Sequence, residues 1–353
     1  MTQSSPGRDR SLNEVRTVIP ATCYERPRRR AWLAVAQAAV LYLAALAGLL
    51  LVDVWWLLVP LWVLAGLGVA GLFVLGHDAS HNALVDSARA NRVLARLCMG
   101  PSAHIEAAWD VGHNRIHHGY TTRQGFDFVW HPVTPDEYRE FGWRRRVQHR
   151  IEWSGVGAGA YYLRTVWWQK MMRFRPEGPR RRTIRAARAR LVGAVSAVLT
   201  VAAIVGWLTS GPVGVVWLPL KLFAVPFLVF VQVIGWTVYV HHVGPGIRWW
   251  TRREWNRFRG QMESTTILKM PAVVNRLWFH NIFIHTPHHV DPRIPFHQLP
   301  AAADAIAAAY PGTVRVSRFS VRDYLRTTRQ CKLYDFESGC WLPYAAAVTK
   351  RSP

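Results

Sequence analysis

Residues 54–81 have the sequence VWWLLVPLWVLAGLGVAGLFVLGHDASH, an apolar run that ends in two histidines. No charged residue occurs from Val54 to Gly76. A helix needs about 20 predominantly apolar residues to cross a bilayer, and this run meets that length. The sequence therefore predicts a membrane-spanning helix whose end presents His77 and His81, four residues apart and on one face.

Three more apolar runs of similar length occur in the chain. The four runs cover residues 31–52, 54–76, 191–209 and 215–240. Asp53 separates the first two, and Ser210, Gly211 and Pro212 separate the last two, so each pair has room only for a tight turn. We therefore expect an all-α integral membrane protein with four transmembrane helices in two hairpins.

The distribution of charge predicts how these helices are oriented. The net charge is +23, which in a soluble protein would indicate nucleic-acid binding. Here the basic clusters lie at residues 26–30, 144–146 and 180–190 and beyond residue 248, whereas the two hairpin turns contain no Lys or Arg. Short basic loops mark the cytoplasmic side of a membrane protein. We expect a protein of the cell inner membrane type, with both termini and the active site in the cytoplasm. The basic surface would contact anionic membrane lipids, not nucleic acid.

The rest of the chain is organised around this membrane domain. Residues 1–30 are polar and rich in charge and proline, which predicts a disordered cytoplasmic tail. Residues 31–345 would form one membrane domain with a cytoplasmic helical cap, and residues 346–353 a C-terminal tail.

Eight of the fifteen histidines lie in three short motifs, HDASH, HNRIHH and HTPHH. Histidines three or four positions apart share one face of a helix, and imidazole suits iron, zinc, copper and nickel. Eight imidazoles exceed the three or four ligands of one zinc ion, so two metals sharing the set is the simplest interpretation. The candidate ligands are His77, His81, His113, His117, His118, His285, His288 and His289. The isolated His104, His131, His149 and His297 are expected to be structural.

In their order around two hairpins, HDxxH, HxxxHH and HxxHH resemble the histidine boxes of the membrane fatty-acid desaturases. The stretch WFHNIFIHTPHHVDPRIPFHQL, residues 278–299, resembles the last box of the acyl-lipid, omega-6 (delta-12) branch. CKLYDFESGCW, residues 331–341, resembles the C-terminal segment of that family. The resemblance implies an oxidoreductase that uses two non-haem iron ions and O2 to insert a cis double bond into a long, lipid-linked acyl chain.

The resemblance also implies further site residues and partners. A Tyr-x-x-His pattern places His242 after Tyr239 as a ninth ligand, with His241 outside the ligand set. Ligating histidines need partners for their outer ring nitrogens, and no catalytic residue is expected beyond the ligands. The candidate partners are Asp78, Asp110, Asn114, Asp127, His241, His280, Asn281 and Asp291. A separate electron donor is required, and a small acidic, ferredoxin-like protein would complement the basic cytoplasmic face.

Three other functions are compatible with parts of the pattern. A related di-iron hydroxylase, epoxygenase or alkane or carotenoid oxygenase would use the same metal site, and analysis of the product separates these reactions. A metal transporter would carry ionisable residues within its spans, and these runs are almost bare of them. A haem electron carrier would place its axial histidines within the spans, and an optical spectrum tests this.

Overall fold

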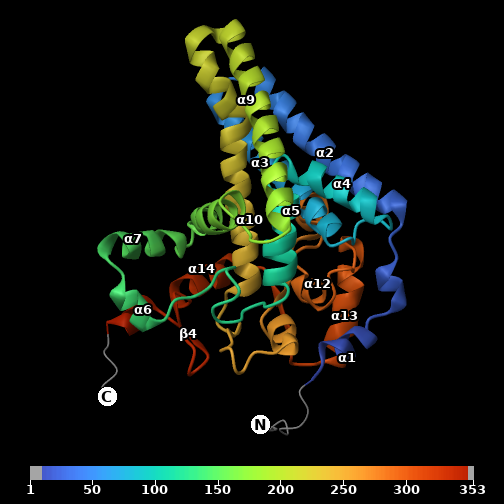
Figure 1. Cartoon of the computed structure of the whole chain (residues 1–353), viewed down its shortest axis with the longest axis vertical. Coiled ribbons are helices and arrows are strands. Elements are labelled where there is room, and N and C mark those ends of the chain that lie inside the picture. Colours follow the sequence, from blue (N-terminus) through green and yellow to red (C-terminus); the bar gives the residue numbers. More distant parts are fainter. Residues whose placement is uncertain (1–9, 349–353) are drawn as a thin grey trace.

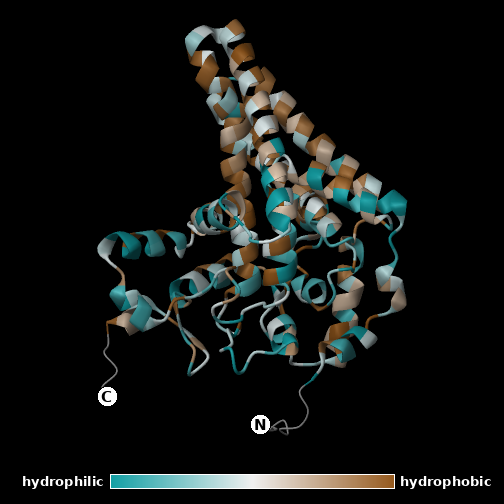
Figure 2. Ribbon diagram, viewed as in Figure 1, coloured by the Kyte–Doolittle hydropathy of each residue, from teal (hydrophilic) through white to brown (hydrophobic). Residues whose placement is uncertain are grey.

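Long apolar helices extend to one end of the protein, and shorter helices gather around their other ends (Figure 1). The computed structural model describes residues 10–348. The long helices are α2 (Arg28–Leu51), α3 (Trp55–Ser80), α9 (Arg180–Pro219) and α10 (Val225–His242), with η4 (Leu220–Ala224) joining the last two. Figure 2 shows that hydrophobic residues predominate along them.

Three segments of the described chain are long and apolar enough to cross a membrane: Arg28–Leu51, Trp55–Ser80 and Arg180–His242. The third contains a tight reversal at Gly211, whose φ of 62° and ψ of −150° are accessible essentially only to glycine. A Cβ on Gly206 would lie 2.0 Å from the carbonyl oxygen of Gly214, so the two arms pack backbone to backbone. The third segment is therefore a helical hairpin, whose arms rise and return side by side in Figure 1.

Helix α3 is the central element of the long-helix bundle, and glycines let its neighbours approach closely. A Cβ on Gly66 would lie 2.4 Å from Cγ1 of Val229 in α10. On another face, a Cβ on Gly68 would lie 2.9 Å from Cα of Tyr42 in α2. Small residues at such crossings allow the close packing that holds apolar helices together. This packing fixes the end of α3, and with it the first histidine motif, against α10.

Short helices surround the end of the long-helix bundle at which α3 and α10 carry their histidines. Before α9 these are α4 (Ala88–Met99), α5 (Glu106–Trp109), η2 (Asp110–His117), α6 (Pro135–Glu140), α7 (Trp143–Glu152), α8 (Ala158–Tyr161) and η3 (Tyr162–Met172). After α10 they are η5 (Arg259–Glu263), α11 (Ala272–Val274), η6 (Asn275–Phe279), α12 (His285–Val290), η7 (Phe296–Gln298), α13 (Leu299–Ala309), α14 (Val321–Gln330) and η8 (Tyr344–Ala347).

The prediction of a purely helical protein is wrong in one detail, because the described residues also form two small sheets. Strands β1 (Thr266–Lys269) and β2 (Arg315–Arg318) pair in parallel, with Thr266 opposite Arg315. Strands β3 (Leu333–Asp335) and β4 (Cys340–Leu342) pair antiparallel. The strands have three or four residues each, too short for an alternating pattern to be distinguished in the sequence.

The prediction of a disordered N-terminal tail is wrong for residues 11–30. Helix α1 (Leu12–Thr17), the turn η1 (Ala21–Tyr24) and the start of α2 occupy this segment. Val15 and Cys23 are buried against α12 and α13, because apolar side chains recur between the charges and cover a hydrophobic cluster of the cap. Residues 1–9 of the predicted tail lie outside the described residues. At the other end, Ala347 is buried at the end of η8, so residues 346 and 347 pack against the protein. Residues 349–353 of the predicted C-terminal tail lie outside the described range.

Candidate metal centre

The nine histidines predicted as ligands come together in two groups. The first group contains His77, His81, His113, His118 and His288. The second contains His117, His242, His285 and His289. Within each group the possible ligand atoms all lie within 4.8 Å of one another. The structure thus brings together every predicted ligand, and it divides them five to four.

The local helix type explains how neighbouring histidines reach different groups. Helix η2 is a π-helix, in which backbone hydrogen bonds join residues five apart, as between the His118 N–H and the His113 carbonyl at 3.0 Å. His113 and His118 are five apart and their Nε2 atoms are 3.2 Å apart, so both belong to the first group. His117 points to the second group. The α-helical spacing assumed from HxxxHH would have paired His113 with His117, which is wrong.

Helix α12 divides its histidines in a similar way. His285 and His289 are four apart and share the second group, while His288 lies between them and reaches the first. One helical turn therefore contributes to both groups. His242 at the end of α10 joins the second group, with its Nε2 3.2 Å from that of His285.

The ring nitrogens converge in a way that suits a cation. His113 Nε2 lies 2.9 Å from His77 Nε2 and 3.2 Å from His118 Nε2, and His285 Nε2 lies 2.9 Å from His289 Nε2. Each ring nitrogen carries either one hydrogen or one lone pair, so His113 Nε2 has only one donor or acceptor position for its two neighbours. A metal ion between converging lone pairs satisfies all of these nitrogens at once. The residues present therefore fit the predicted metal centre.

Burial prepares these rings for metal binding. Desolvation, followed by the neighbouring histidines, lowers the pKa well below its ordinary value in His81, His113, His118, His285, His288 and His289. The rings are therefore neutral near pH 7. Because a histidine ligand must be deprotonated, a neutral set binds a metal ion without releasing protons.

Two of the predicted carboxylates hold outer ring nitrogens. Asp127 lies with its two oxygens 3.0 and 3.1 Å from His117 Nδ1. Asp78 lies with Oδ1 3.3 Å from His77 Nδ1, and its Oδ2 accepts a hydrogen bond from the backbone N–H of Phe296. Such partners fix the tautomer, leaving Nε2 as the nitrogen that faces the group.

Two further residues, which the sequence did not indicate, lie beside the outer ring nitrogen of His289. Gln261 Oε1 lies 2.7 Å from His289 Nδ1, and the Thr121 hydroxyl lies 3.2 Å from the same nitrogen. The Thr121 hydroxyl also donates to the backbone oxygen of His117. Both residues lie outside the recognised histidine motifs, and only the folded chain brings η5 beside α12. The sequence contained no signal that would have selected them.

Two other predicted carboxylates have different partners, so their predicted role is wrong. Asp110 pairs with Arg115 at 3.1 Å and with Arg180 at 3.6 Å on the surface. Asp291 pairs with Arg293 at 2.6 Å and accepts a hydrogen bond from the Tyr24 hydroxyl. Asp291 therefore ties the chain after α12 to the N-terminal segment.

The two predicted asparagines also bond elsewhere. Asn114 Nδ2 donates to the backbone oxygen of Ser80 at 3.0 Å, which links η2 to the end of α3. Asn281 Nδ2 donates to the backbone oxygen of Phe296, and its Oδ1 accepts from Asn275. They connect segments that carry histidines, but these hydrogen bonds are not made with the imidazoles.

The two remaining histidines lie beside the centre without joining a group. His241 stacks on His285, with ring centroids 3.9 Å apart and an interplanar angle of 22°. His280 is buried and packs against Phe296. The isolated His104 is a structural residue, since its ring lies 2.8 Å from the Ser102 carbonyl and 2.9 Å from the Tyr162 hydroxyl.

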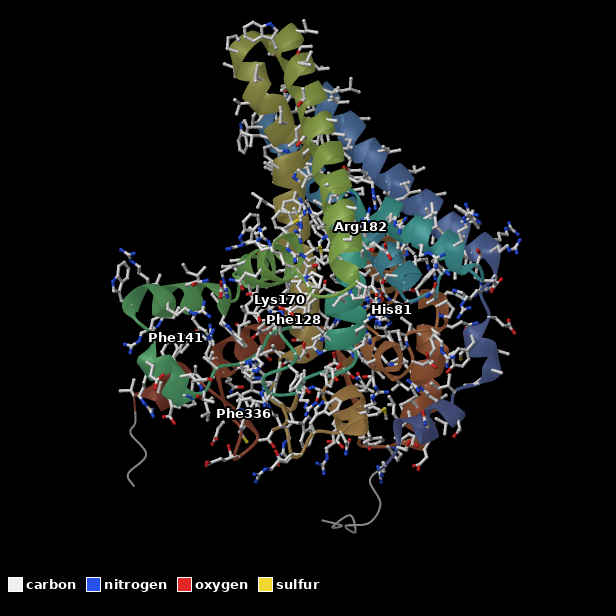
Figure 3. The ribbon with its side chains drawn as sticks, viewed as in Figure 1. His81, Phe128, Phe141, Lys170, Arg182 and Phe336 are labelled. Carbon is white, nitrogen blue, oxygen red and sulfur yellow. The ribbon has the colours of Figure 1, made fainter. Side chains whose placement is uncertain are left out.

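A narrow apolar cavity ends at the histidines. Its apolar lining comes from α3, η3, α10 and adjoining segments, and includes Phe73, Val166, Met171, Ile234 and Ile282. Its polar end consists of His77, His113, His117, His242 and His285, drawn from both groups. Lys170 and Phe128 also line the cavity, and the Lys170 ammonium lies 5.5 Å from the centroid of the Phe128 ring. Figure 3 labels both residues at about the same height as His81 in the view. Such a cavity suits a long hydrocarbon chain with its reacting carbons next to the metals.

The sequence pattern that defines the fatty acid desaturase family matches residues 53–320 of this chain. The chain belongs to the fatty acid desaturase family and is an oxidoreductase acting on fatty acyl lipids, which confirms the resemblance seen in the histidine motifs.

Several relatives are similar over most of the chain. It is 29% identical to the sn-1 oleoyl-lipid 12-desaturase of Picosynechococcus sp., over 92% of this chain and 90% of the relative. It is 27% identical to the chloroplastic omega-6 fatty acid desaturase of Glycine max, over 93% of this chain and 74% of the relative. It is 29% identical to the sn-1 acyl-lipid omega-3 desaturase (ferredoxin) of Synechocystis sp., over 84% of this chain and 80% of the relative.

Proposed function

We propose that this protein inserts a cis double bond into a lipid-linked C16 or C18 acyl chain, at the delta-12 position of a monounsaturated substrate. The observation that carries the proposal is an apolar cavity at whose end histidines of both groups meet. Relatives that act as 12-desaturases and omega-6 desaturases support the position of the new double bond.

We propose that two iron ions occupy the two groups. The five histidines of the first group and the four of the second would hold one ion each, and imidazole suits iron. When bound, the ions supply the O2 chemistry that removes two hydrogens from neighbouring methylene carbons. O2 takes up these two hydrogens together with two electrons and two protons, and leaves as two water molecules. The ring partners Asp127, Asp78 and Gln261 keep each ligating nitrogen directed inward.

The chain itself positions the substrate and excludes water. Away from its histidine end the cavity lining is mostly apolar, so an acyl chain is stabilised there by leaving water. Val166 and Met171 of η3 form one wall and Ile234 of α10 another, next to the histidines. A hydrocarbon held between these walls presents the same pair of carbons to the metals at each turnover.

The electrons would come from a separate acidic protein of the ferredoxin type. The net charge of +23 gives such a donor a complementary surface, and one relative carries ferredoxin in its name.

We further propose that the long segments cross the membrane four times, with both termini and the histidines in the cytoplasm. Each arm of the Arg180–His242 hairpin would cross once, with Ser210 at its outer turn. Cysteine labelling tests this topology. Ser210→Cys in a Cys340→Ser background should react with an impermeant reagent from outside the cell. The wild-type protein, whose exposed cysteine is Cys340, should react only after the membrane is opened. Labelling of both from the same side would contradict the topology.

The reaction is tested by expression in a host that contains monounsaturated lipids, with a ferredoxin supplied. Fatty-acid analysis by mass spectrometry should show dienes with a new delta-12 double bond. The His118→Ala variant is the matched control, because it lacks one ligand of the first group and should give none. Hydroxy acids in place of dienes would contradict desaturation, and so would unchanged lipids with every donor supplied.

A further inference from the structure

Helix α7 has an apolar face that the described protein leaves uncovered. Trp143 is 71% exposed, Val147 49% and Ile151 54%. These residues are four apart, so they form one stripe along the helix, which we call the α7 stripe. A helix on a water-exposed surface ordinarily turns its apolar side inward.

The opposite face of α7 is polar and is attached to the protein. Glu152 is buried and forms an ion pair with Arg164 of η3. His149 is buried, with Nδ1 2.8 Å from the Tyr344 hydroxyl. Polar contacts therefore hold the helix in place and fix the α7 stripe on the outside.

Arginines border the α7 stripe on both sides. Successive residues of a helix are rotated by about 100° around its axis, so Arg144 lies next to the stripe on one side, and Arg146 and Arg150 lie next to it on the other. All three are exposed. A helix with an apolar stripe between cationic borders is typical of one that lies in a membrane interface and binds anionic headgroups.

The surroundings of α7 place the stripe next to the membrane segment. In Figure 1 the helix projects sideways at the foot of the long helices, across the direction of α10. Ile151 continues into an apolar groove formed with Leu163, Trp167 and Trp168 of η3. The other side of η3 supplies Val166 to the acyl cavity, so α7 and the cavity wall are attached to the same helix.

We propose that the α7 stripe lies in the headgroup layer of an anionic bilayer, with its bordering arginines bound to lipid phosphates. The proposal rests on the membrane location in the proposed function but not on the reaction. Trp143, Val147 and Ile151 would enter the boundary between headgroups and acyl chains, and the Glu152–Arg164 pair would connect this contact to η3. The phosphate layer supplies the negative charge that the arginines otherwise lack.

A fluorescent probe on the stripe tests the contact in reconstituted vesicles. Val147→Cys in a Cys340→Ser background carries an environment-sensitive dye, since Cys23, Cys98 and Cys331 are buried. In phosphatidylglycerol vesicles its emission should shift to the blue, and spin-labelled lipids should quench it. The wild-type protein labelled at the exposed Cys340 is the control and should show neither effect.

Charge reversal tests the role of the arginines. Arg144 lies over the Trp143 ring, 5.3 Å from its centroid, and Arg144→Glu should shift the equilibrium between quenched and unquenched dye by about fivefold or more. The matched control is Arg253→Glu, also an exposed arginine but outside α7, which should leave the dye unchanged. The labelled protein that keeps Arg144 should show the same loss of quenching when phosphatidylcholine, which has no net charge, replaces phosphatidylglycerol.

Several results would overturn the inference. A dye at residue 147 that stays water-exposed in phosphatidylglycerol would do so. A dye that is shielded but not quenched by the labelled lipids would show that protein covers the stripe. Equal quenching in both lipids, unaffected by Arg144→Glu, would refute the anionic contact. Desaturation measured on the same vesicles separates the two proposals, because an active protein with an exposed dye contradicts only the α7 contact.

Discussion

The Asp127→Asn substitution tests whether the partner of a ligating histidine controls the metal. The two Asp127 oxygens face His117 Nδ1 at 3.0 and 3.1 Å, and they accept hydrogen bonds from the backbone N–H groups of Thr122 at 2.8 Å and Val129 at 3.0 Å. Asparagine keeps the size of the side chain but loses the charge, and it replaces one acceptor oxygen with a donor. One of the three N–H groups must then lose its partner.

The expected loss of metal affinity can be bounded. Removing the partner of a ligating histidine typically lowers affinity about 10- to 100-fold, which corresponds to about 1.4 to 2.7 kcal/mol. The effect should fall on the second group, because His117 belongs to it. Asp110→Asn is the matched control: it also lies near the histidines in sequence, but its partners are the surface residues Arg115 and Arg180.

Iron content measured during titration with a chelator is the assay. Asp127→Asn should release one of two irons at a lower chelator concentration than the wild type, while the other stays bound. Asp110→Asn should behave as the wild type. The reasoning would be refuted if Asp127→Asn held both irons at wild-type affinity, or if the two variants lost iron equally.

Three further predictions follow from the same structure. His242→Ala should lose the second-group iron in metal analysis and His241→Ala should keep both, whereas the reverse result would mean that the assigned end of α10 is off by one residue. Val166→Trp fills the acyl cavity, so it should abolish desaturation with both irons retained, whereas Val192→Trp on the exposed face of α9 should remain active. Burial lowers the pKa of His104 from 6.5 to about 3, so the neutral ring contributes stability above pH 6.5 that is lost as the pH falls toward 3, at up to about 1.4 kcal/mol per pH unit. Unfolding measured above and below pH 6.5 should therefore show a flatter pH dependence in His104→Gln, and an unchanged slope would contradict this assignment.

The long helices and the ligand residues could be predicted from the sequence because both are local features. An uncharged run of sufficient length indicates a spanning helix wherever it occurs, and α2 and α3 begin and end close to the predicted runs. Helix α10 ends close to the predicted residue 240 but begins at Val225, because the first ten residues of the predicted run belong to α9 and η4. Helix α9 begins earlier, at Arg180, since a helix can continue beyond the apolar residues into a charged segment. The spacing of the histidines selected eight of the nine members of the two groups, and the resemblance to the family's Tyr-x-x-His pattern selected His242.

The N-terminal segment shows where local composition was insufficient. Its polar residues suggested disorder, yet Val15 and Cys23 are buried because α12 and α13 offer an apolar surface that the sequence does not place beside them. The burial of a few side chains outweighed the average polarity of the segment.

The division of the ligands was decided by tertiary structure alone. Whether His117 joins His113 depends on the π-helical winding of η2, whose backbone hydrogen bonds join residues five apart instead of the four of an α-helix. Whether Asp127 or Asp110 holds a histidine depends on which way the chain turns after η2, and the contact of Gln261 with His289 requires two segments far apart in the sequence. Residue types and their spacing along a helix determine which side chains are able to bind a metal. Which of them meet, and around which ion, depends on contacts between segments, because a hydrogen bond or a shared ligand position exists only where the folded backbone brings both partners within about 3 Å.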